Sequence, residues 1–129
     1  MKIPNSSKVP HLAIIDDDES VRNGMKNLIR ALGYTADAFD SAKAFLESNL
    51  IQTVSCLITD VHMRGMSGVE LQQHLSAAGH RTPIIFVTAQ PNDATRAHVI
   101  RDGAIGYLSK PLGEQSFMAC LAKALNLNH

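Results

Sequence analysis

Five polar side chains stand at the ends of apolar runs that have the length of buried strands. They are Asp16, Asp17, Asp60, Thr88 and Lys110. If the runs are parallel strands of one sheet, these side chains emerge at a single edge, where open α/β sheets bind their ligands. Carboxylates without His or Cys partners suit Mg²⁺, while an ammonium and a hydroxyl suit the oxygens of a phosphoryl group. The pattern therefore indicates metal and phosphate chemistry.

Asp60 is the best candidate for covalent chemistry in this group, because an aspartate can accept a phosphoryl group as an acyl phosphate. It stands alone on the middle run, whereas Asp16 and Asp17 form a pair better suited to holding a metal ion. Each residue also has an ordinary explanation on its own, since an Asp after a strand is usually a helix cap and a Lys near a loop is usually solvated. The interpretation rests on their convergence.

Strand and helix patterns alternate five times along the chain. The expected strands cover residues 11–15, 34–39, 54–59, 84–87 and 105–109. Apolar residues at helical spacing follow them, in the segments 21–32, 42–46, 69–75, 92–102 and 117–125. This alternation predicts a parallel sheet covered by helices on both faces. Residues 1–10 are expected to be an irregular lead-in, and residues 11–126 to form the domain.

Composition limits the classes of function. A chain of 129 residues with 45% apolar and 19% charged residues is expected to form one globular domain. Its formal charge of zero gives no reason to expect nucleic-acid or membrane binding. No apolar stretch approaches the roughly 20 residues of a membrane span and no secretory leader is apparent, so a cytoplasmic location is expected. The two cysteines, Cys56 and Cys120, have no metal-type spacing and are expected to be small buried apolar residues.

Four motifs in one order carry a family resemblance. They are Ile14–Glu19, Leu57–Met63 together with Met66–Leu71, Ile84–Ala89, and Gly103–Pro111. With them the sequence resembles the receiver domain of bacterial two-component response regulators, in particular those that precede LuxR-type helix-turn-helix domains. The resemblance implies a flavodoxin-like (βα)5 fold with a five-stranded parallel sheet of strand order 2-1-3-4-5.

The resemblance also implies a phosphorylation site and a metal site. Asp60 is expected to accept a phosphoryl group from a sensor histidine kinase or a phosphotransfer protein. Asp16, Asp17, Asp60 and the backbone carbonyl of His62 are expected to hold Mg²⁺, with Mn²⁺ as a possible substitute. Such a domain loads once and hydrolyses its phosphoryl group slowly, so it is expected to be a signalling protein and not a turnover enzyme.

A further set of residues is expected to bind the phosphoryl group and to transmit its presence. Thr88, the backbone of Ala89 and Lys110 would contact the phosphoryl group, and a cis peptide bond would precede Pro111. Tyr107 would swing inward and alter the surface formed by the fourth helix, the fifth strand and the last helix, with homodimerisation as one outcome. The alternative is that Tyr107 is simply a half-buried aromatic residue of a strand.

Three positions give this sequence its own character. Arg64 stands where receivers usually have proline, which removes a rigid residue from the loop after Asp60 and adds a charge. His62 and Gln90 occupy positions that flank the path of the hydrolytic water in receivers, and we hypothesise that they tune the lifetime of the phosphoryl group. Alternatively, both are exposed loop residues without kinetic effect.

Other readings remain open from the sequence. A phosphatase of the haloacid dehalogenase type also uses an Asp nucleophile and Mg²⁺, and Asp16–Asp18 followed by Ser20 superficially fits its motif, but that reading leaves Asp60 unexplained. A phosphorylation-independent interaction module on the same fold would typically lack one active-site group, and none is missing here. No output domain is expected within this chain, which is either a single-domain regulator or the receiver part of a longer one.

Overall fold

The apolar runs form the five strands of one parallel sheet. The computed structural model describes residues 9–126. The strands are β1 (His11–Ile15), β2 (Thr35–Phe39), β3 (Cys56–Asp60), β4 (Ile84–Thr88) and β5 (Gly106–Ser109). Their order in the sheet is β2-β1-β3-β4-β5, and every neighbouring pair is parallel. The predicted strand order is confirmed.

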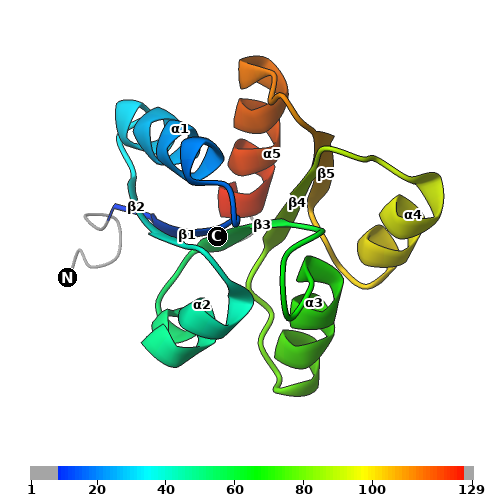
Figure 1. Ribbon diagram of the computed structural model, residues 1–129. Coiled ribbons are helices and arrows are strands. Elements are labelled where there is room, and N and C mark those ends of the chain that lie inside the picture. The colour runs from blue at the N-terminus through cyan, green and yellow to red at the C-terminus, as the bar shows by residue number, and fades with distance from the viewer. Residues whose placement is uncertain (1–8, 127–129) are drawn as a thin grey trace.

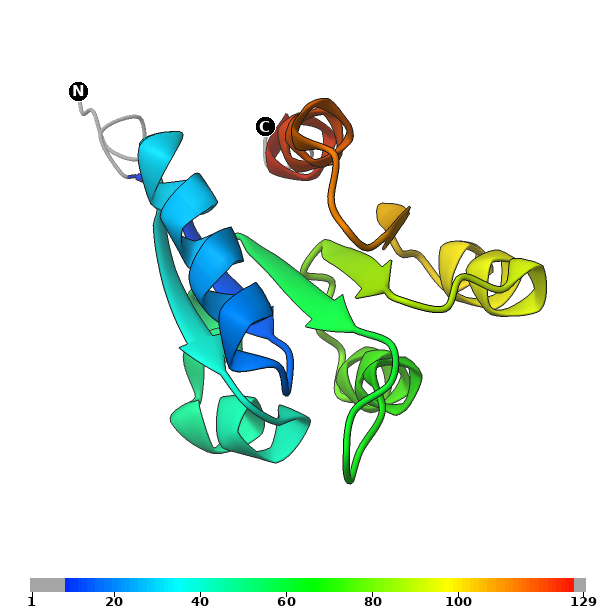
Figure 2. The same cartoon turned by 45° about the horizontal axis from the view of Figure 1, so that its top comes forward.

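Helices connect the strands and cover both faces of the sheet. They are α1 (Glu19–Ala31), α2 (Ala42–Ser48), α3 (Gly68–Ala77), α4 (Asp93–Arg101) and α5 (Glu114–Asn126), with a short 3-10 helix η2 (Leu50–Gln52) after α2. Figure 1 shows α1 and α5 on one face, and α2 and α3 on the other. The view in Figure 2 separates the same two layers and shows α4 beside the β5 edge.

Alternation of side chains along the strands builds one core on each face, because successive strand residues point to opposite sides. In β1, Leu12 and Ile14 join Met25 of α1 and Phe117 of α5 in one core. Ala13 and Ile15 join the second core, whose other members include residues of α2, α3 and α4. Strands buried on both faces explain why the runs read as continuously apolar.

Short polar residues cap the beginnings of α1, α2 and α3. The Asp18 carboxylate accepts hydrogen bonds from the first turn of α1, and the Ser41 hydroxyl does so for α2. Ser67 and Glu70 form a reciprocal capping box at α3. Gly33 has φ +94°, a left-handed conformation that ends α1 and favours glycine.

Several predicted bounds are wrong by one or two residues. The strand expected at 54–59 begins at Cys56, because the Val54 N–H donates to the carbonyl of Leu50, the first residue of η2, and not to the sheet. The strand continues to Asp60, which pairs with Val87. The strand expected at 84–87 extends one residue further, to Thr88. The sequence pattern also gave no sign of η2, which follows Asn49 in a left-handed conformation (φ 61°).

Residues 1–8 of the expected lead-in lie outside the described part of the chain, and Val9 and Pro10 have no regular secondary structure. Within residues 9–126, no helix is both long enough and apolar enough to cross a bilayer.

Candidate functional site at the carboxyl edge of the sheet

Four neighbouring strands bring the chemically active side chains to one edge. Asp16 directly follows β1, Asp60 ends β3, Thr88 ends β4, and Lys110 directly follows β5. Because all these strands run in the same direction, their carboxyl ends lie side by side. The convergence expected from the sequence is therefore present in the structure.

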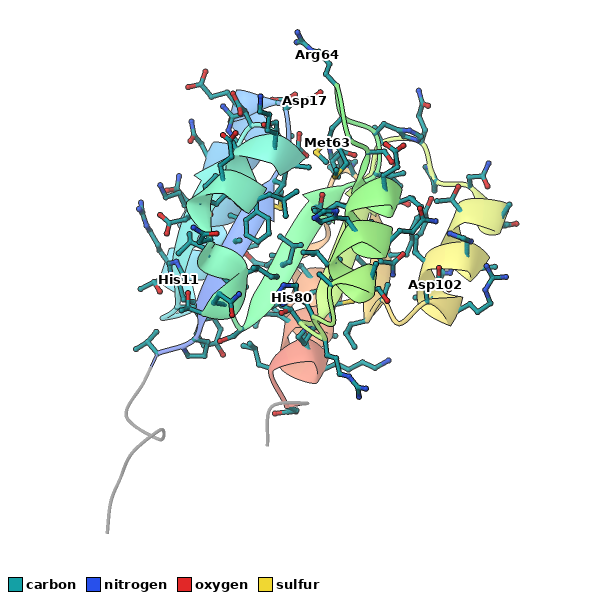
Figure 3. All side chains as sticks on the ribbon, turned by 90° about the horizontal axis from the view of Figure 1, so that it is seen from below. His11, Asp17, Met63, Arg64, His80 and Asp102 are labelled. Carbon is teal, nitrogen blue, oxygen red and sulfur yellow. The ribbon has the colours of Figure 1, made fainter. Side chains whose placement is uncertain are left out.

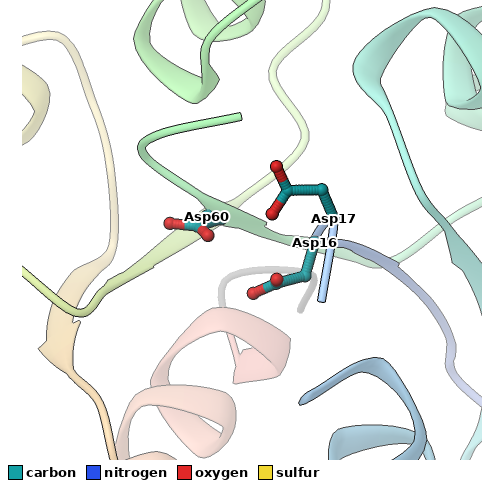
Figure 4. Close-up of side chains that lie close together, drawn as sticks. All are labelled: Asp16, Asp17 and Asp60. Atoms are coloured by element: carbon teal, nitrogen blue, oxygen red, sulfur yellow. The ribbon is translucent and has the colours of Figure 1, made fainter. Parts of the chain in front are cut away.

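Three carboxylates face a common point at this edge (Figure 4). Asp16, Asp17 and Asp60 each offer an oxygen, and these oxygens lie within 4.8 Å of one another. Asp16 is fully buried and Asp60 is 6% exposed, whereas Asp17 is open to solvent. The cluster therefore has a buried floor and one solvent-facing side.

Lys110 joins the two buried carboxylates. Its Nζ lies 2.8 Å from Oδ2 of Asp16 and 3.0 Å from Oδ2 of Asp60. The contact with Asp60 is a hydrogen bond. The contact with Asp16 is a close ion pair whose angles are poor for a hydrogen bond, so that this oxygen lacks a well-formed one among the described residues. One ammonium thus balances two carboxylates incompletely.

The pKa values of Asp16 and Lys110 are both raised above their usual values, for different reasons. Burial is the main cause that raises the pKa of Asp16, and the nearby charge of Asp60 adds to it, while the Lys110 ammonium and the Asp18 N–H act against it. Burial acts to lower the pKa of Lys110, but the two carboxylates outweigh it and raise that pKa. The Lys110 ammonium therefore stays charged, while the Asp16 carboxylate binds a proton more readily than an ordinary aspartate does.

This donor set fits a hard divalent cation. Mg²⁺ prefers oxygen ligands in a site that stays partly open to water. Asp16 Oδ2 is buried without a full hydrogen-bond complement, and Asp17 provides an exposed carboxylate beside it. The backbone carbonyl of His62 belongs to the loop directly after Asp60. A cation here would relieve the repulsion between the carboxylates.

The residues after β3 and β4 form the rim of the site. Asp60 Oδ1 accepts a hydrogen bond from the His62 backbone N–H at 3.3 Å. The Thr88 hydroxyl is fully buried and accepts from the Gln90 N–H at 3.0 Å. Ala89 and the side chains of His62 and Gln90 are exposed. Solvent therefore reaches the rim, while Thr88 lies beneath it.

Tyr107 and Arg64 have contrasting orientations. Tyr107 is 7% exposed, and its hydroxyl accepts a hydrogen bond at 3.1 Å from the backbone N–H of Asn92, the residue that caps α4. Arg64 extends away from the molecule in Figure 3, beyond Met63 and Asp17. The charge of Arg64 thus lies outside the carboxylate cluster. The peptide bond between Lys110 and Pro111 is cis.

Two supporting residues were not anticipated from the sequence. Nη1 of Arg22 donates to the backbone carbonyl of Asp16 at 2.8 Å, which fixes the turn between β1 and α1. Gly68 packs directly against the backbone carbonyl of Asp60, so closely that no Cβ fits between them. Gly68 directly precedes the expected helical segment 69–75, where glycine is an ordinary residue, so the sequence pattern gave no signal of this contact.

A largely apolar groove opens beside the site. It has a volume of about 500 Å³ and lies between α1 and the segment after β5. Its lining residues are Val21, Gly24, Met25, Leu28, Lys110, Pro111 and Leu112. Because Lys110 belongs both to this groove and to the carboxylate cluster, a protein docked here would lie next to Asp60.

The chain belongs to the response regulator receiver domain family, which it matches over residues 12–122. It is accordingly a receiver domain of a two-component system, a class of domain that interacts with histidine kinases and is distinct from metabolic enzymes.

Named relatives support this assignment. The chain is 33% identical to the transcriptional regulatory protein TdiR of Thauera aromatica, across 99% of this chain and 56% of TdiR. It is 32% identical to the response regulator protein TodT of Pseudomonas putida, across 95% of this chain and 54% of TodT. The structure of the response regulator StyR aligns with a TM-score of 0.87 and 39% identity, across 94% of this chain and 61% of that one. The chain thus spans about half the length of the curated relatives it matches.

Proposed function

We propose that Asp60 accepts a phosphoryl group from the phosphohistidine of a sensor histidine kinase or a phosphotransfer protein. A carboxylate oxygen of Asp60 forms a bond to phosphorus while the bond between phosphorus and the imidazole nitrogen breaks, and the electron pair leaves with that nitrogen. The observation that carries this proposal is the hydrogen bond of 3.0 Å between Lys110 Nζ and Asp60, which holds the carboxylate ready beside a cation.

The neighbouring residues have complementary roles in this proposal. Asp16, Asp17, Asp60 and the carbonyl of His62 would hold Mg²⁺, which supplies charge neutralisation for the phosphoryl oxygens. Lys110 binds one phosphoryl oxygen as it turns from its carboxylate partners. The Thr88 hydroxyl, which now accepts from the Gln90 N–H, has its own proton free to donate to the phosphoryl group.

The groove beside Lys110 is the docking surface that we infer for the phosphodonor. An apolar lining that borders the acceptor would seat a helix of the donor protein, with its phosphohistidine directed toward Asp60. We further infer that phosphorylation alters the surface formed by α4, β5 and α5, through Thr88 and Tyr107, and that this surface then forms a homodimer or contacts an output domain. The relative TdiR is named a transcriptional regulatory protein and is nearly twice as long as this chain, which supports a role for such a surface in controlling transcription.

Acetyl phosphate with Mg²⁺ tests the acceptor directly. Intact mass is measured for the wild type, for Asp60→Ala, and for Glu47→Gln, which removes an exposed carboxylate on α2. We expect one adduct in the wild type and in Glu47→Gln, none in Asp60→Ala, and none when EDTA removes Mg²⁺. An adduct that persists in Asp60→Ala would mean that another residue, and not Asp60, is the nucleophile. Size-exclusion chromatography of the same samples reports whether the adduct causes dimerisation.

The lifetime of the adduct tests the roles of His62 and Gln90. Their exposed side chains border the phosphoryl position, so His62→Ala and Gln90→Ala are expected to change the rate of dephosphorylation without preventing phosphorylation. Unchanged half-lives in both variants would reduce the two residues to ordinary loop positions. Repeated turnover of a phosphate ester by the wild type would instead favour a phosphatase.

A further inference from the structure

Helix α4 is attached to the rest of the domain by little apolar packing. Val99 is its buried side chain, Thr95 and His98 are partly buried, and the other residues of α4 are exposed, including Ile100 at 43%. A helix with so small an apolar contact depends on its polar contacts for a fixed position. The structure provides a hydrogen bond near each end of α4, in addition to an exposed contact of 3.5 Å between Gln73 Nε2 and His98 Nε2.

The N-terminal contact is the hydrogen bond from Asn92 to Tyr107 described above. The C-terminal contact comes from Gln72 of α3, whose Nε2 donates to the backbone carbonyl of Val99 at 3.0 Å. That carbonyl also accepts the N–H of Ala104 at 2.9 Å. Gln72 is 3% exposed, which is unusual for glutamine and places the whole amide inside the protein.

Gln72 bridges α3 and α4 where apolar side chains leave space between them. Two hollows of about 220 and 540 Å³ lie between these helices, and both are lined by Gln72, Ser76, Asp102 and Gly103. Figure 3 shows Asp102 at the end of α4 and His80 near the end of α3, on the two sides of this region. The last turn of α4 therefore borders open space and not a filled apolar interface.

The second polar atom of the amide shows what the glutamine contributes. Oε1 of Gln72 is buried and has no hydrogen-bond partner among the described residues, which disfavours the folded state. A methionine would fill the same volume without that cost. The favourable contribution of glutamine at this position is thus its hydrogen bond to α4.

We propose that Gln72 is a positioning residue that fixes the C-terminal end of α4. When the contact between Tyr107 and Asn92 is broken, the N-terminal half of α4 moves and the last turn stays attached to α3. The anchoring follows from the contacts of Gln72 alone, whereas its part in signalling rests on the proposed phosphorylation of Asp60.

Hydrogen–deuterium exchange without a phosphodonor tests the anchoring. The variants are Gln72→Met, Gln72→Leu as a second apolar replacement, and Gln115→Met as a matched control at an exposed position of α5. In the two Gln72 variants, the amides of residues 102–104 should exchange about tenfold faster relative to those of β3, as expected for the loss of one buried hydrogen bond. Exchange in Gln115→Met should match the wild type. Wild-type exchange at residues 102–104 in both Gln72 variants would overturn the proposal.

A second arm adds acetyl phosphate and Mg²⁺ to the wild type and to Gln72→Met, with intact mass measured on each sample. In phosphorylated wild type, exchange should change at residues 92–97 and remain constant at 102–104, while in Gln72→Met both segments should change. Changes in both segments of the wild type would overturn the proposal that the last turn of α4 stays attached to α3. A missing adduct would count against phosphorylation of Asp60, and the first arm would still decide the role of Gln72.

Discussion

Replacing Gly68 with alanine tests the contact between α3 and the end of β3. Gly68 is the first residue of α3, and its N–H donates to the Val61 carbonyl at 2.9 Å. An added Cβ would overlap the carbonyl oxygen of Asp60 and lie 3.2 Å from Cε1 of Phe86. Strand backbone and a fully buried ring are rigid neighbours, so α3 would have to move away from β3.

The magnitude follows from two opposing effects. Overpacking against rigid neighbours costs about 1–3 kcal/mol, and alanine in place of glycine returns up to about 1 kcal/mol of helix propensity. We expect the free energy of unfolding to fall by about 1–2 kcal/mol. For a chain of 129 residues this corresponds to a decrease of roughly 3–8 °C in Tm.

Gly24→Ala is the matched control. Gly24 lies inside α1, and a Cβ there would meet no atom within 4 Å. The same chemical change should therefore raise the free energy of unfolding by about 0.5–1 kcal/mol, through helix propensity alone. Urea unfolding of both variants, monitored by circular dichroism, measures whether each substitution raises or lowers the free energy of unfolding. A Gly68→Ala protein as stable as Gly24→Ala would refute the close contact.

Three further predictions concern the polar groups. Tyr107→Phe should lower the free energy of unfolding by about 1 kcal/mol and speed amide exchange at Asn92, the cap of α4. Unchanged exchange would mean that the Tyr107 hydroxyl does not fix this end of α4. Lys110→Met leaves the carboxylates of Asp16 and Asp60 without their ammonium. It should lower the free energy of unfolding by about 2–4 kcal/mol in urea titrations without Mg²⁺, and by less with Mg²⁺. Equal losses in the two conditions would contradict the electrostatic account. Burial raises the pKa of the Cys56 thiol from 9.0 to about 12, so between these pH values the native state binds more protons than the unfolded state. The free energy of unfolding should therefore fall as the pH rises from 9 to 12. The fall should be shallower in Cys56→Ala.

The strands and helices could largely be predicted, because the spacing of apolar residues along a segment depends only on that segment. The four motifs also determined the order of the strands through the resemblance they carry. The placement of Asp60, Thr88 and Lys110 at one edge follows from strand direction alone, since parallel strands end together. Strand bounds were less predictable, because whether Val54 pairs with the sheet or with η2 depends on a turn that begins at Asn49.

The missed residues share a physical reason. Gln72 and Gln73 form a polar pair typical of an exposed helix face, yet Gln72 is buried and donates to the Val99 carbonyl of α4. Arg22 likewise reads as an exposed helical charge, and its contact with the Asp16 carbonyl depends on how β1 turns into α1. Contacts between elements distant in sequence are set by the packed fold, and a pattern along the chain does not contain them.

The ion pair between Lys110 and Asp60 joins residues 50 positions apart, and this separation has a consequence for synthesis. A chain that emerges from its amino end presents both buried aspartates before the lysine that balances them. Until β5 takes its place at the sheet edge, the nascent domain lacks the cation that would hold the acceptor carboxylate. The contact that we propose prepares Asp60 for phosphorylation therefore forms only in a chain that includes β5 and Lys110.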